Sequence, residues 1–406
     1  NYFWRYFLMN EMLIINLDMF QAAAIACGVL LLGRVCVAKF EVLRRFCIPE
    51  PVVGGVIFAL VHLALRSAGI LEISFDSTLQ TVFMNMFFCS VGFAAAFKML
   101  KKGGKLVFVF LALAIAMVVA QNAMGAGIAA AFGLNPLLGI ATGSVPMVGG
   151  HGTSAAFGPI LEAAGLEGGT AVAVASATFG LVAGCLIGGP IASSVIKKYN
   201  LKPTANASGN EVEEEVAGTI DGGRFLNAIM FLLIALGIGT IIGKYLTLWT
   251  GISFPGYIGA MMAAAIIRNV FEIKNWDVPM EEINTIGGYS LSVFLGLAMM
   301  GLKLWQLADL AIPMIVMLIA QTVLMFVVAR FVCFNILGKD YDAAVISSGL
   351  CGFGMGATPN AMANMQAVTK KNGPSPTAFL VVPLVGSLFI DFFNSIIITL
   401  MISFLG

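Results

Sequence analysis

Two glycine-rich stretches hold the residue types best suited to bind a small carboxylate. The first covers residues 139–159 and contributes these candidates for substrate contact: Gly150, His151, Gly152, Thr153 and Ser154. Glycine lets a backbone turn without Cβ clashes. A helix that begins after such a turn presents free N–H groups and the positive end of its dipole, which suits a carboxylate. Close packing between helices is the alternative use of these glycines.

The second stretch, residues 346–365, has the same character. Its candidates for substrate contact are Gly352, Gly354, Gly356, Thr358 and Asn360. Threonine is a good N-cap and proline fits the first turn of a helix. We therefore expect Thr358 to cap a short helix that begins at 358–360, with Pro359 in its first turn.

A separate group of oxygen-bearing side chains could bind a cation. Asp391 is the only acidic residue deep in an apolar run, and Asn394 follows one helical turn later. Hard oxygen ligands of this kind suit hard cations such as sodium. The candidates for cation binding are Asp391, Asn394, Asn364, Gln121 and Asn122. In the alternative interpretation, Asp391 forms a buried ion pair with Lys303 or Arg330.

Three of these candidates also have a structural interpretation. His151 could relay protons, since imidazole titrates near neutral pH, or it could brace a hairpin through hydrogen bonds. Gln121 and Asn122 lie midway along an apolar run, where an amide either lines a polar cavity or joins two helices.

The elements that would position these residues are membrane helices. The chain has 406 residues, of which 59% are hydrophobic and 11% charged, whereas soluble domains carry about 25% charged residues. Helices satisfy backbone polar groups in lipid, and a span needs about 20 apolar residues. The apolar runs predict ten spans, at residues 13–38, 49–69, 80–100, 106–130, 168–196, 225–246, 253–271, 287–307, 311–337 and 376–404. The stretches 136–160 and 343–367 are too interrupted to be spans, and we predict that both are re-entrant hairpins.

The basic residues predict the orientation. With both termini outside, only four of the 22 Lys and Arg residues fall outside, and the other 18 fall inside. Those four are Arg5, Arg66, Lys244 and Lys303. Inside segments of membrane proteins carry this excess of Lys and Arg.

A polar segment, residues 199–223, divides the chain into two repeats, 1–198 and 224–406. Each half holds five predicted spans, so the second half would enter the membrane upside down. The halves also match at a nearly constant offset: Gln121 with Gln321, and Gly184 with Gly386. Inverted repeats with interrupted helices are typical of secondary transporters, whose site lies at the midplane.

Several functions are disfavoured by composition. The net charge of +1 and the lack of a basic, aromatic-rich cluster give no sign of nucleic-acid binding. Two histidines are too few for a histidine-based transition-metal site. The chain lacks H-E-x-x-H and G-x-S-x-G motifs, so we do not expect an enzyme.

Six stretches carry a resemblance to the bacterial sodium:glutamate symporter family. They are IPEPVVGG (48–55), GGHGTSAAFGP (149–159), ATFGLVAGCLIGGPIA (177–192), LSVFLGLAMMGLKLW (291–305), GKDYDAAVISSGLCGFGMGATPNAMANMQAV (338–368) and AFLVVPLVGSLFIDFFN (378–394). The resemblance implies import of glutamate with sodium, ten spans and one re-entrant loop per inverted half. It also implies that the loop tips, Gly150–Thr153 and Gly352–Gly356, lie along the translocation path.

Residues and resemblance together predict an all-α, multi-pass protein of the bacterial inner membrane that imports glutamate with sodium by alternating access. A homodimer is expected by analogy with related transporter families. A sodium-coupled carrier of another small carboxylate or amino acid is one alternative, and an ion channel is another. Two different hairpins per chain favour a carrier, because channel filters are built from rings of repeated segments.

Overall fold

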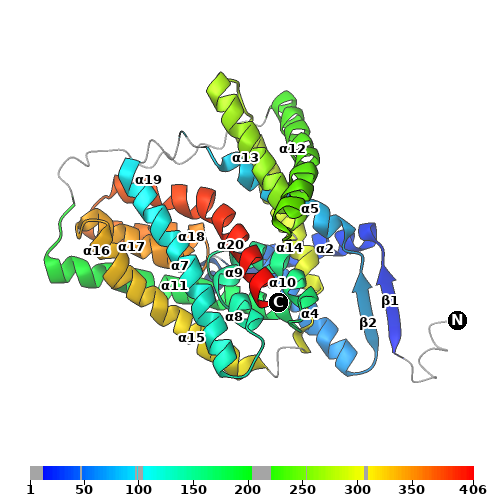
Figure 1. Cartoon of the computed structure of the whole chain (residues 1–406). Helices are drawn as coiled ribbons and strands as arrows, with labels where there is room; N and C mark the ends of the chain where they lie inside the picture. The colour runs from blue at the N-terminus through cyan, green and yellow to red at the C-terminus, as the bar shows by residue number, and fades with distance from the viewer. Residues whose placement is uncertain are drawn as a thin grey trace.

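The computed structural model describes residues 12–45, 48–96, 98, 104–203, 221–252, 254–305 and 310–406. Most of the predicted polar segment, 204–220, therefore lies outside the described residues. The chain is almost entirely helical, and its helices pack as two groups (Figure 1).

Group I contains six long helices, three from each half of the chain: α2 (Met19–Lys39), α4 (Glu50–Ser67), α5 (Thr78–Ala94), α12 (Gly222–Thr250), α13 (Gly256–Lys274) and α14 (Met280–Met300). The short helix α3 (Glu41–Arg45) joins α2 to α4. Within the group, α5 packs on α13 and α14, and α4 packs on α2 and α14. The pair α12 and α13 projects from the rest of the molecule at the top of Figure 1.

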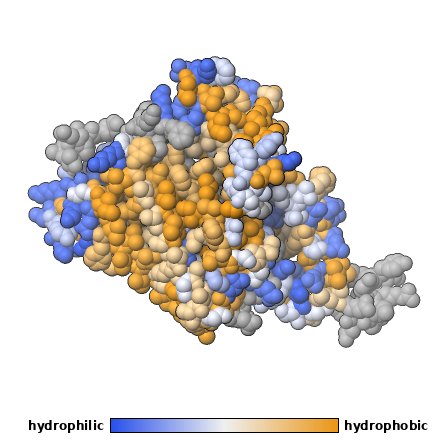
Figure 2. All heavy atoms as spheres, in the orientation of Figure 1, coloured by the Kyte–Doolittle hydropathy of each residue, from blue (hydrophilic) through white to orange (hydrophobic). Residues whose placement is uncertain are grey.

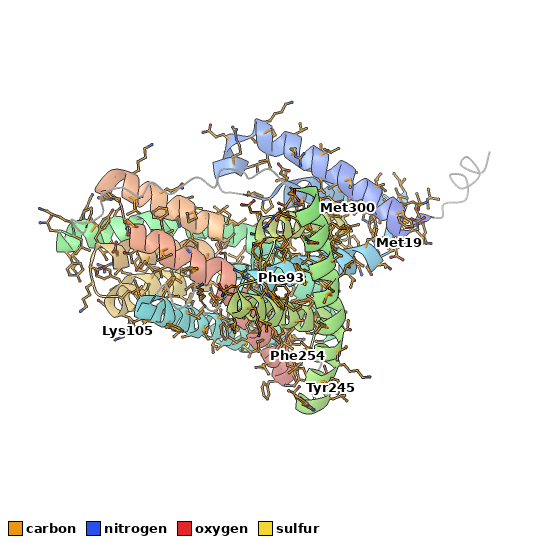
Figure 3. The ribbon with its side chains drawn as sticks, turned by 90° about the horizontal axis from the view of Figure 1, so that it is seen from above. Met19, Phe93, Lys105, Tyr245, Phe254 and Met300 are labelled. Carbon is orange, nitrogen blue, oxygen red and sulfur yellow. The ribbon has the colours of Figure 1, made fainter. Side chains whose placement is uncertain are left out.

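Group II contains the remaining helices. They are α7 (Gly104–Ala131), α8 (Leu137–Ala141), α9 (Ser144–Met147), α10 (Gly150–Ala163), α11 (Gly169–Tyr199), α15 (Ala311–Val327), α16 (Phe334–Ile336), α17 (Tyr341–Phe353), α18 (Thr358–Asn372), α19 (Pro376–Pro383) and α20 (Ile390–Leu405). Two π-helical turns continue these helices, η2 (Val328–Cys333) from α15 into α16 and η3 (Leu384–Phe389) from α19 into α20. Seen from above, Lys105 at the start of α7 lies far from Met19 and Met300, which belong to group I (Figure 3).

Close glycine contacts set the spacing between several helices. A Cβ on Gly33 of α2 would lie 1.9 Å from the carbonyl oxygen of Glu50, and one on Gly54 of α4 would lie 2.0 Å from that of Val29. The pair α12 and α13 crosses in the same way, since a Cβ on Gly259 would lie 2.1 Å from the oxygen of Gly239. At these crossings the two backbones touch with no side chain between them.

The apolar surface fits a membrane protein. Among the described residues, nine helices or continuous helical runs are long and apolar enough to cross a membrane, and α5 is a shorter apolar helix of 17 residues. The space-filling view shows a broad hydrophobic face over the helices, with hydrophilic residues gathered towards its edges (Figure 2). Each of the ten predicted spans coincides with one of these helices, which confirms the polytopic helical fold.

The start of the first predicted span is wrong. Residues Leu13–Leu17 form a strand, β1, that pairs in parallel with β2 (Leu71–Phe75) after α4. Asp18 then caps α2, because its side chain accepts hydrogen bonds from the backbone N–H groups of Phe20 and Gln21. The Gln21 side chain in turn accepts a hydrogen bond from the backbone N–H of Asp18, which completes a capping box. The helix therefore begins at Met19, and two short strands accompany the otherwise all-helical fold.

Candidate functional site

Both glycine-rich stretches are helices broken in the middle. The first stretch, residues 139–159, begins in α8 and continues through α9. After a break at Val148–Gly149 it continues as α10. Gly150 has a φ of +59°, a left-handed conformation that few residues other than glycine adopt. The second stretch is α17 followed by α18, with the break at Gly354–Ala357.

The two breaks meet. A Cβ on Gly150 would lie 2.9 Å from the carbonyl oxygen of Gly356. The neighbouring helix α11 passes the second break just as closely, since a Cβ on Gly180 would lie 2.2 Å from the oxygen of Met355. The breaks in the two stretches lie about 200 residues apart in the sequence. In the fold they form one junction inside group II.

An amide network from α7 and α15 holds the second break. Gln121 Nε2 donates to the oxygen of Gly354 at 2.8 Å, and Gln321 Nε2 donates to the backbone oxygen of Gln121 at 2.9 Å. Both glutamines are fully buried. These two residues match across the halves of the sequence, and they lie in contact in the fold.

A second amide network holds the first break. The amide of Asn122 exchanges two hydrogen bonds of 2.8 Å with Ser144, donating to its Oγ and accepting from its backbone N–H. Asn394 Nδ2 on α20 donates to the backbone carbonyl oxygen of Ser144 at 3.2 Å. Ser144 therefore joins α7, α9 and α20. Both polar atoms of the Asn122 amide thus take part in a helix contact, and its part in cation binding stays a prediction.

The asparagines of α18 bind the backbone of α11. Asn360 Nδ2 donates to Leu181 O at 2.9 Å, and Asn364 Nδ2 donates to Gly184 O at 3.0 Å and Ser348 O at 3.2 Å. Both side chains are buried, and their hydrogen bonds join α18 to α11 and α17.

Four of these amides keep an unused oxygen. The buried atoms Gln121 Oε1, Gln321 Oε1, Asn360 Oδ1 and Asn394 Oδ1 accept no hydrogen bond from the described residues. A buried oxygen without a partner costs roughly 1–3 kcal/mol. Water or a bound cation would remove that cost, so these oxygens fit a cation whose preferred ligands are hard.

Asp391 lies at the start of α20, directly after η3. Its side chain is partly exposed, and it makes no hydrogen bond or ion pair with any residue that the structure describes. Neither Lys303 nor Arg330 reaches it; the Arg330 guanidinium lies 5.5 Å from the ring centroid of Phe331. The interpretation of Asp391 as an ion-pair partner for these two residues is therefore not supported.

The remaining predicted site residues lie around the junction. His151 Nε2 lies 2.9 Å from Thr178 Oγ1 on α11, so the ring braces α10 against α11. Ser154 Oγ donates to Gly150 O at 2.7 Å and lies 3.2 Å from Ala173 O. Thr153 is buried beside Gly149. These contacts leave the hydroxyl of Ser154 engaged with backbone.

The predicted cap at Thr358 is wrong. The cap residue of α18 is Ala357, which has no side-chain hydrogen bond, and Thr358 Oγ1 instead donates to Gly386 O of η3 at 3.0 Å. The start of the helix at residue 358 and the proline in its first turn are as predicted. No side chain caps the first turn of α18, in which Pro359 has no N–H and the N–H of Asn360 donates to Ala357 O at 3.0 Å.

Gly152 faces group I. A Cβ at this position would lie 3.4 Å from Leu291 of α14 and 3.4 Å from Phe87 of α5. Gly352 and Gly354 are different, because their Cβ positions meet Ala361 of α18 and Met325 of α15 within group II. Gly152 of α10 therefore lies at the boundary between the two groups, whereas Gly352 and Gly354 lie in close contacts within group II.

Sequence reasoning missed Ser144 and Thr178 as site residues, and it used Gln321 only as a repeat match. Ser144 could have been noticed as the polar residue of the first glycine-rich stretch that precedes a proline. Thr178 and Gln321 gave no comparable signal. Among the described residues no group of three or more His, Cys, Asp or Glu side chains could hold a metal ion.

The chain is similar to known proteins over most of its length. The family model described as "Sodium/glutamate symporter" matches residues 15–374. A sodium/glutamate symporter of Escherichia coli (strain K12) is 41% identical over 392 residues, covering 95% of this chain and 97% of that protein. The one from Haemophilus influenzae (strain ATCC 51907 / DSM 11121 / KW20 / Rd) is 40% identical over 389 residues, covering 93% and 95%. A solved sodium/proton antiporter from Methanocaldococcus jannaschii is 15% identical with a TM-score of 0.44, covering 95% of this chain and 96% of that one.

Proposed function

The chain belongs to the sodium/glutamate symporter family, and from this premise we propose that it imports glutamate with sodium across the bacterial inner membrane. The observation that carries the proposal is the junction of the two helix breaks, where Gly150 lies against Gly356. Backbone N–H groups of α10 and α18 end there, beside buried amide oxygens without partners. This combination offers positive dipole ends to a carboxylate and hard oxygens to a cation.

We propose the following roles for the site residues. The backbone N–H groups at the start of α10, Gly150–Gly152, and that of Thr358 at the start of α18 bind the substrate carboxylates. Sodium is bound by Asp391 together with the free amide oxygens of Gln121 and Asn394. Apart from His151, none of these side chains is basic, so the bound cation supplies the charge that offsets an anionic substrate.

Alternating access follows from movement between the two helix groups. The two broken helical stretches belong to group II, and Gly152 of α10 lies against Phe87 of α5 and Leu291 of α14 in group I. Small residues at such a boundary let the groups shift without side chains interlocking.

The inverted repeat has support in the order of the elements. Three long helices of group I, a long helix of group II, a broken stretch and a final long helix occur once before residue 200 and once after residue 221. The contacts are reciprocal as well, since α4 packs on α14 while α5 packs on α13. We infer that residues 136–160 and 343–367 are re-entrant from opposite faces and that the protein is a homodimer.

Both termini are outside in this proposal, and residues 199–223 are cytoplasmic. A cysteine at Lys303, exposed after α14, is expected to react readily with an impermeant thiol reagent in whole cells. A cysteine at Ser208 is expected to react only after the membrane is opened. Each is placed singly in a chain freed of its own cysteines. Ready labelling at Ser208 from outside would contradict the orientation.

The function is tested by uptake into proteoliposomes. Purified protein is expected to accumulate labelled glutamate when sodium is high outside, to saturate with glutamate, and to stop when potassium replaces sodium. A panel with aspartate and other small dicarboxylates defines the substrate. Preference for another carboxylate would move the proposal to that substrate. Sodium currents that neither saturate nor need a substrate would indicate a channel and contradict symport.

A further inference from the structure

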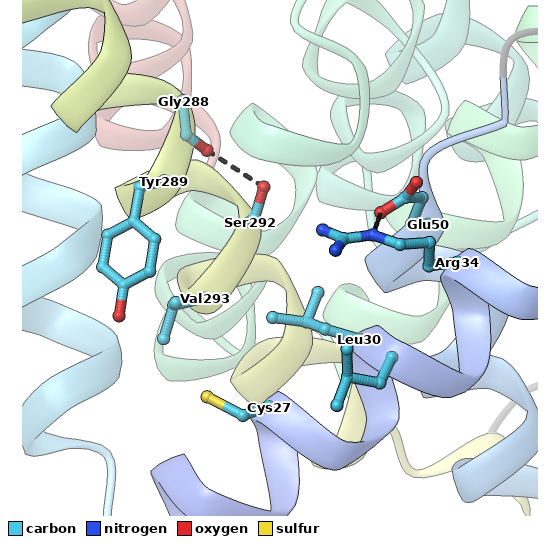
Figure 4. A pocket seen from close by; sticks show the side chains of 9 residues that line it. Cys27, Leu30, Arg34, Glu50, Gly288, Tyr289, Ser292 and Val293 are labelled. Atoms are coloured by element: carbon cyan, nitrogen blue, oxygen red, sulfur yellow. Dashed lines mark hydrogen bonds and ion pairs between the residues drawn. The ribbon is translucent and has the colours of Figure 1, made fainter. Parts of the chain in front are cut away.

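A pocket of about 380 Å³ lies in group I, between α2, α4 and α14, and away from the junction of the broken helices. It is lined by Cys27, Leu30, Leu31, Arg34, Glu50, Gly288, Tyr289, Ser292 and Val293 (Figure 4). The close crossing of α2 and α4 at Gly33 and Gly54 brings its two charged residues together.

Arg34 presents an unused hydrogen-bonding face to this pocket. Its Nε atom donates to Glu50 Oε2 at 3.1 Å, and this is its one ion pair within the part of the chain that the structure describes. The two terminal nitrogens point into the pocket, towards the side of Ser292 (Figure 4). A guanidinium presents donors in a fork that matches a phosphate group.

Besides the polar side chains of Arg34, Glu50, Tyr289 and Ser292, the pocket has an apolar part. Leu30, Leu31 and Val293 form its walls, and Leu31 is 60% exposed although α2 is a candidate membrane span. An occupant would therefore meet an arginine at one end and the hydrocarbon of the membrane along its length. A small soluble anion would match only the first of these features.

The surrounding sequence adds positive charge. Between residues 34 and 50 the chain has four basic residues and two acidic ones. Basic pockets between membrane helices bind the headgroups of anionic lipids, and nearby Lys and Arg residues add to the attraction.

We propose that this pocket binds an anionic phospholipid, with the phosphate on the terminal nitrogens of Arg34 and an acyl chain along Leu30, Leu31 and Val293. The site is independent of sodium and glutamate binding. It gives group I a lipid contact of its own, on the side of α14 away from the broken helices.

The test measures retention of phosphatidylglycerol by purified, delipidated full-length protein in native mass spectrometry. The unmodified protein is expected to bind it more tightly than phosphatidylcholine. Arg34→Gln is expected to weaken binding about tenfold, as the loss of a charge-assisted hydrogen bond implies. Gly288→Phe is expected to block binding by filling the pocket, because Gly288 is exposed and has open space around its Cβ position.

Gly237→Phe is the matched control, since Gly237 is an equally open helical glycine on α12, outside the pocket. It should bind phosphatidylglycerol normally, and all variants should elute as a single species of unchanged size. Unchanged retention in Gly288→Phe would overturn the proposal. So would equal competition by glycerol phosphate, which would assign the pocket to soluble anions. Dissociation of a dimer in Gly288→Phe, with lipid retention intact, would assign it to a second copy of the chain.

Discussion

Replacing Gly150 with valine is expected to abolish sodium-driven glutamate uptake while the protein still inserts into the membrane. The φ of +59° at this position is unfavourable for any residue with a Cβ, and most of all for a β-branched one. The new side chain would also press on Gly356 O, which lies 2.9 Å from the Cβ position. Displacing the two breaks by about 1 Å would lower the initial rate on the order of 100-fold.

Gly127→Val serves as the control for this experiment. Gly127 lies on α7 with open space around its Cβ position, so its variant should transport at a nearly normal rate. Gly352 is less suitable as a test, because its Cβ would meet the backbone of Ala361 at 2.3 Å and loss of activity could reflect misfolding. Normal uptake by Gly150→Val would remove the helix junction from the translocation path.

Replacing Asp391 with asparagine is expected to raise the sodium concentration for half-maximal uptake at least about tenfold. The change keeps the shape and one oxygen but removes the charge. Two unit charges about 4 Å apart attract by roughly 4 kcal/mol at an effective dielectric constant near 20. A tenfold rise in the sodium concentration for half-maximal uptake corresponds to about 1.4 kcal/mol. This is less than the full attraction, because binding also desolvates both charges. The measurement is uptake against sodium concentration at fixed membrane potential.

Asp18→Asn is the matched control, since Asp18 lies at the end of a span as the N-cap of α2. Asparagine caps a helix as well as aspartate does, so sodium dependence and yield should both stay normal. If Asp391→Asn lowers the protein yield and leaves sodium dependence unchanged, Asp391 has a structural role. The cation site would then be sought at the free oxygens of Gln121 and Asn360.

The membrane helices could be predicted because a long apolar run has few alternatives in lipid. The strand at Leu13–Leu17 could not, since five mostly apolar residues at the start of such a run look the same as the first turn of a helix. Its pairing partner, Leu71–Phe75, lies beyond α4, and nothing local in the sequence indicates that contact.

The candidate site, too, could be predicted from the sequence only in part. Its residue types and the interrupted helices were visible in the sequence, because glycine spacing and buried amides are local features. The partners were not. Asn122 was equally compatible with a polar cavity and with a helix contact, and its contact with Ser144 of another helix could not be predicted from the sequence. The predicted cap at Thr358 is wrong for a similar reason. Its hydroxyl donates a hydrogen bond to the backbone oxygen of Gly386, 28 residues away in the sequence.

The π-helical turn η3 has a consequence for variation in chain length. A π turn inserts one residue into a helix, while the segments on either side keep their α-helical register. Deleting one residue between Leu384 and Phe389 would therefore restore a continuous α-helix and leave Asn394 facing Ser144. The same deletion within α20, between Asp391 and Asn394, would turn the two residues apart by about 100°, the angle per residue of an α-helix. Relatives one residue shorter in this region are thus expected to have their gap in η3.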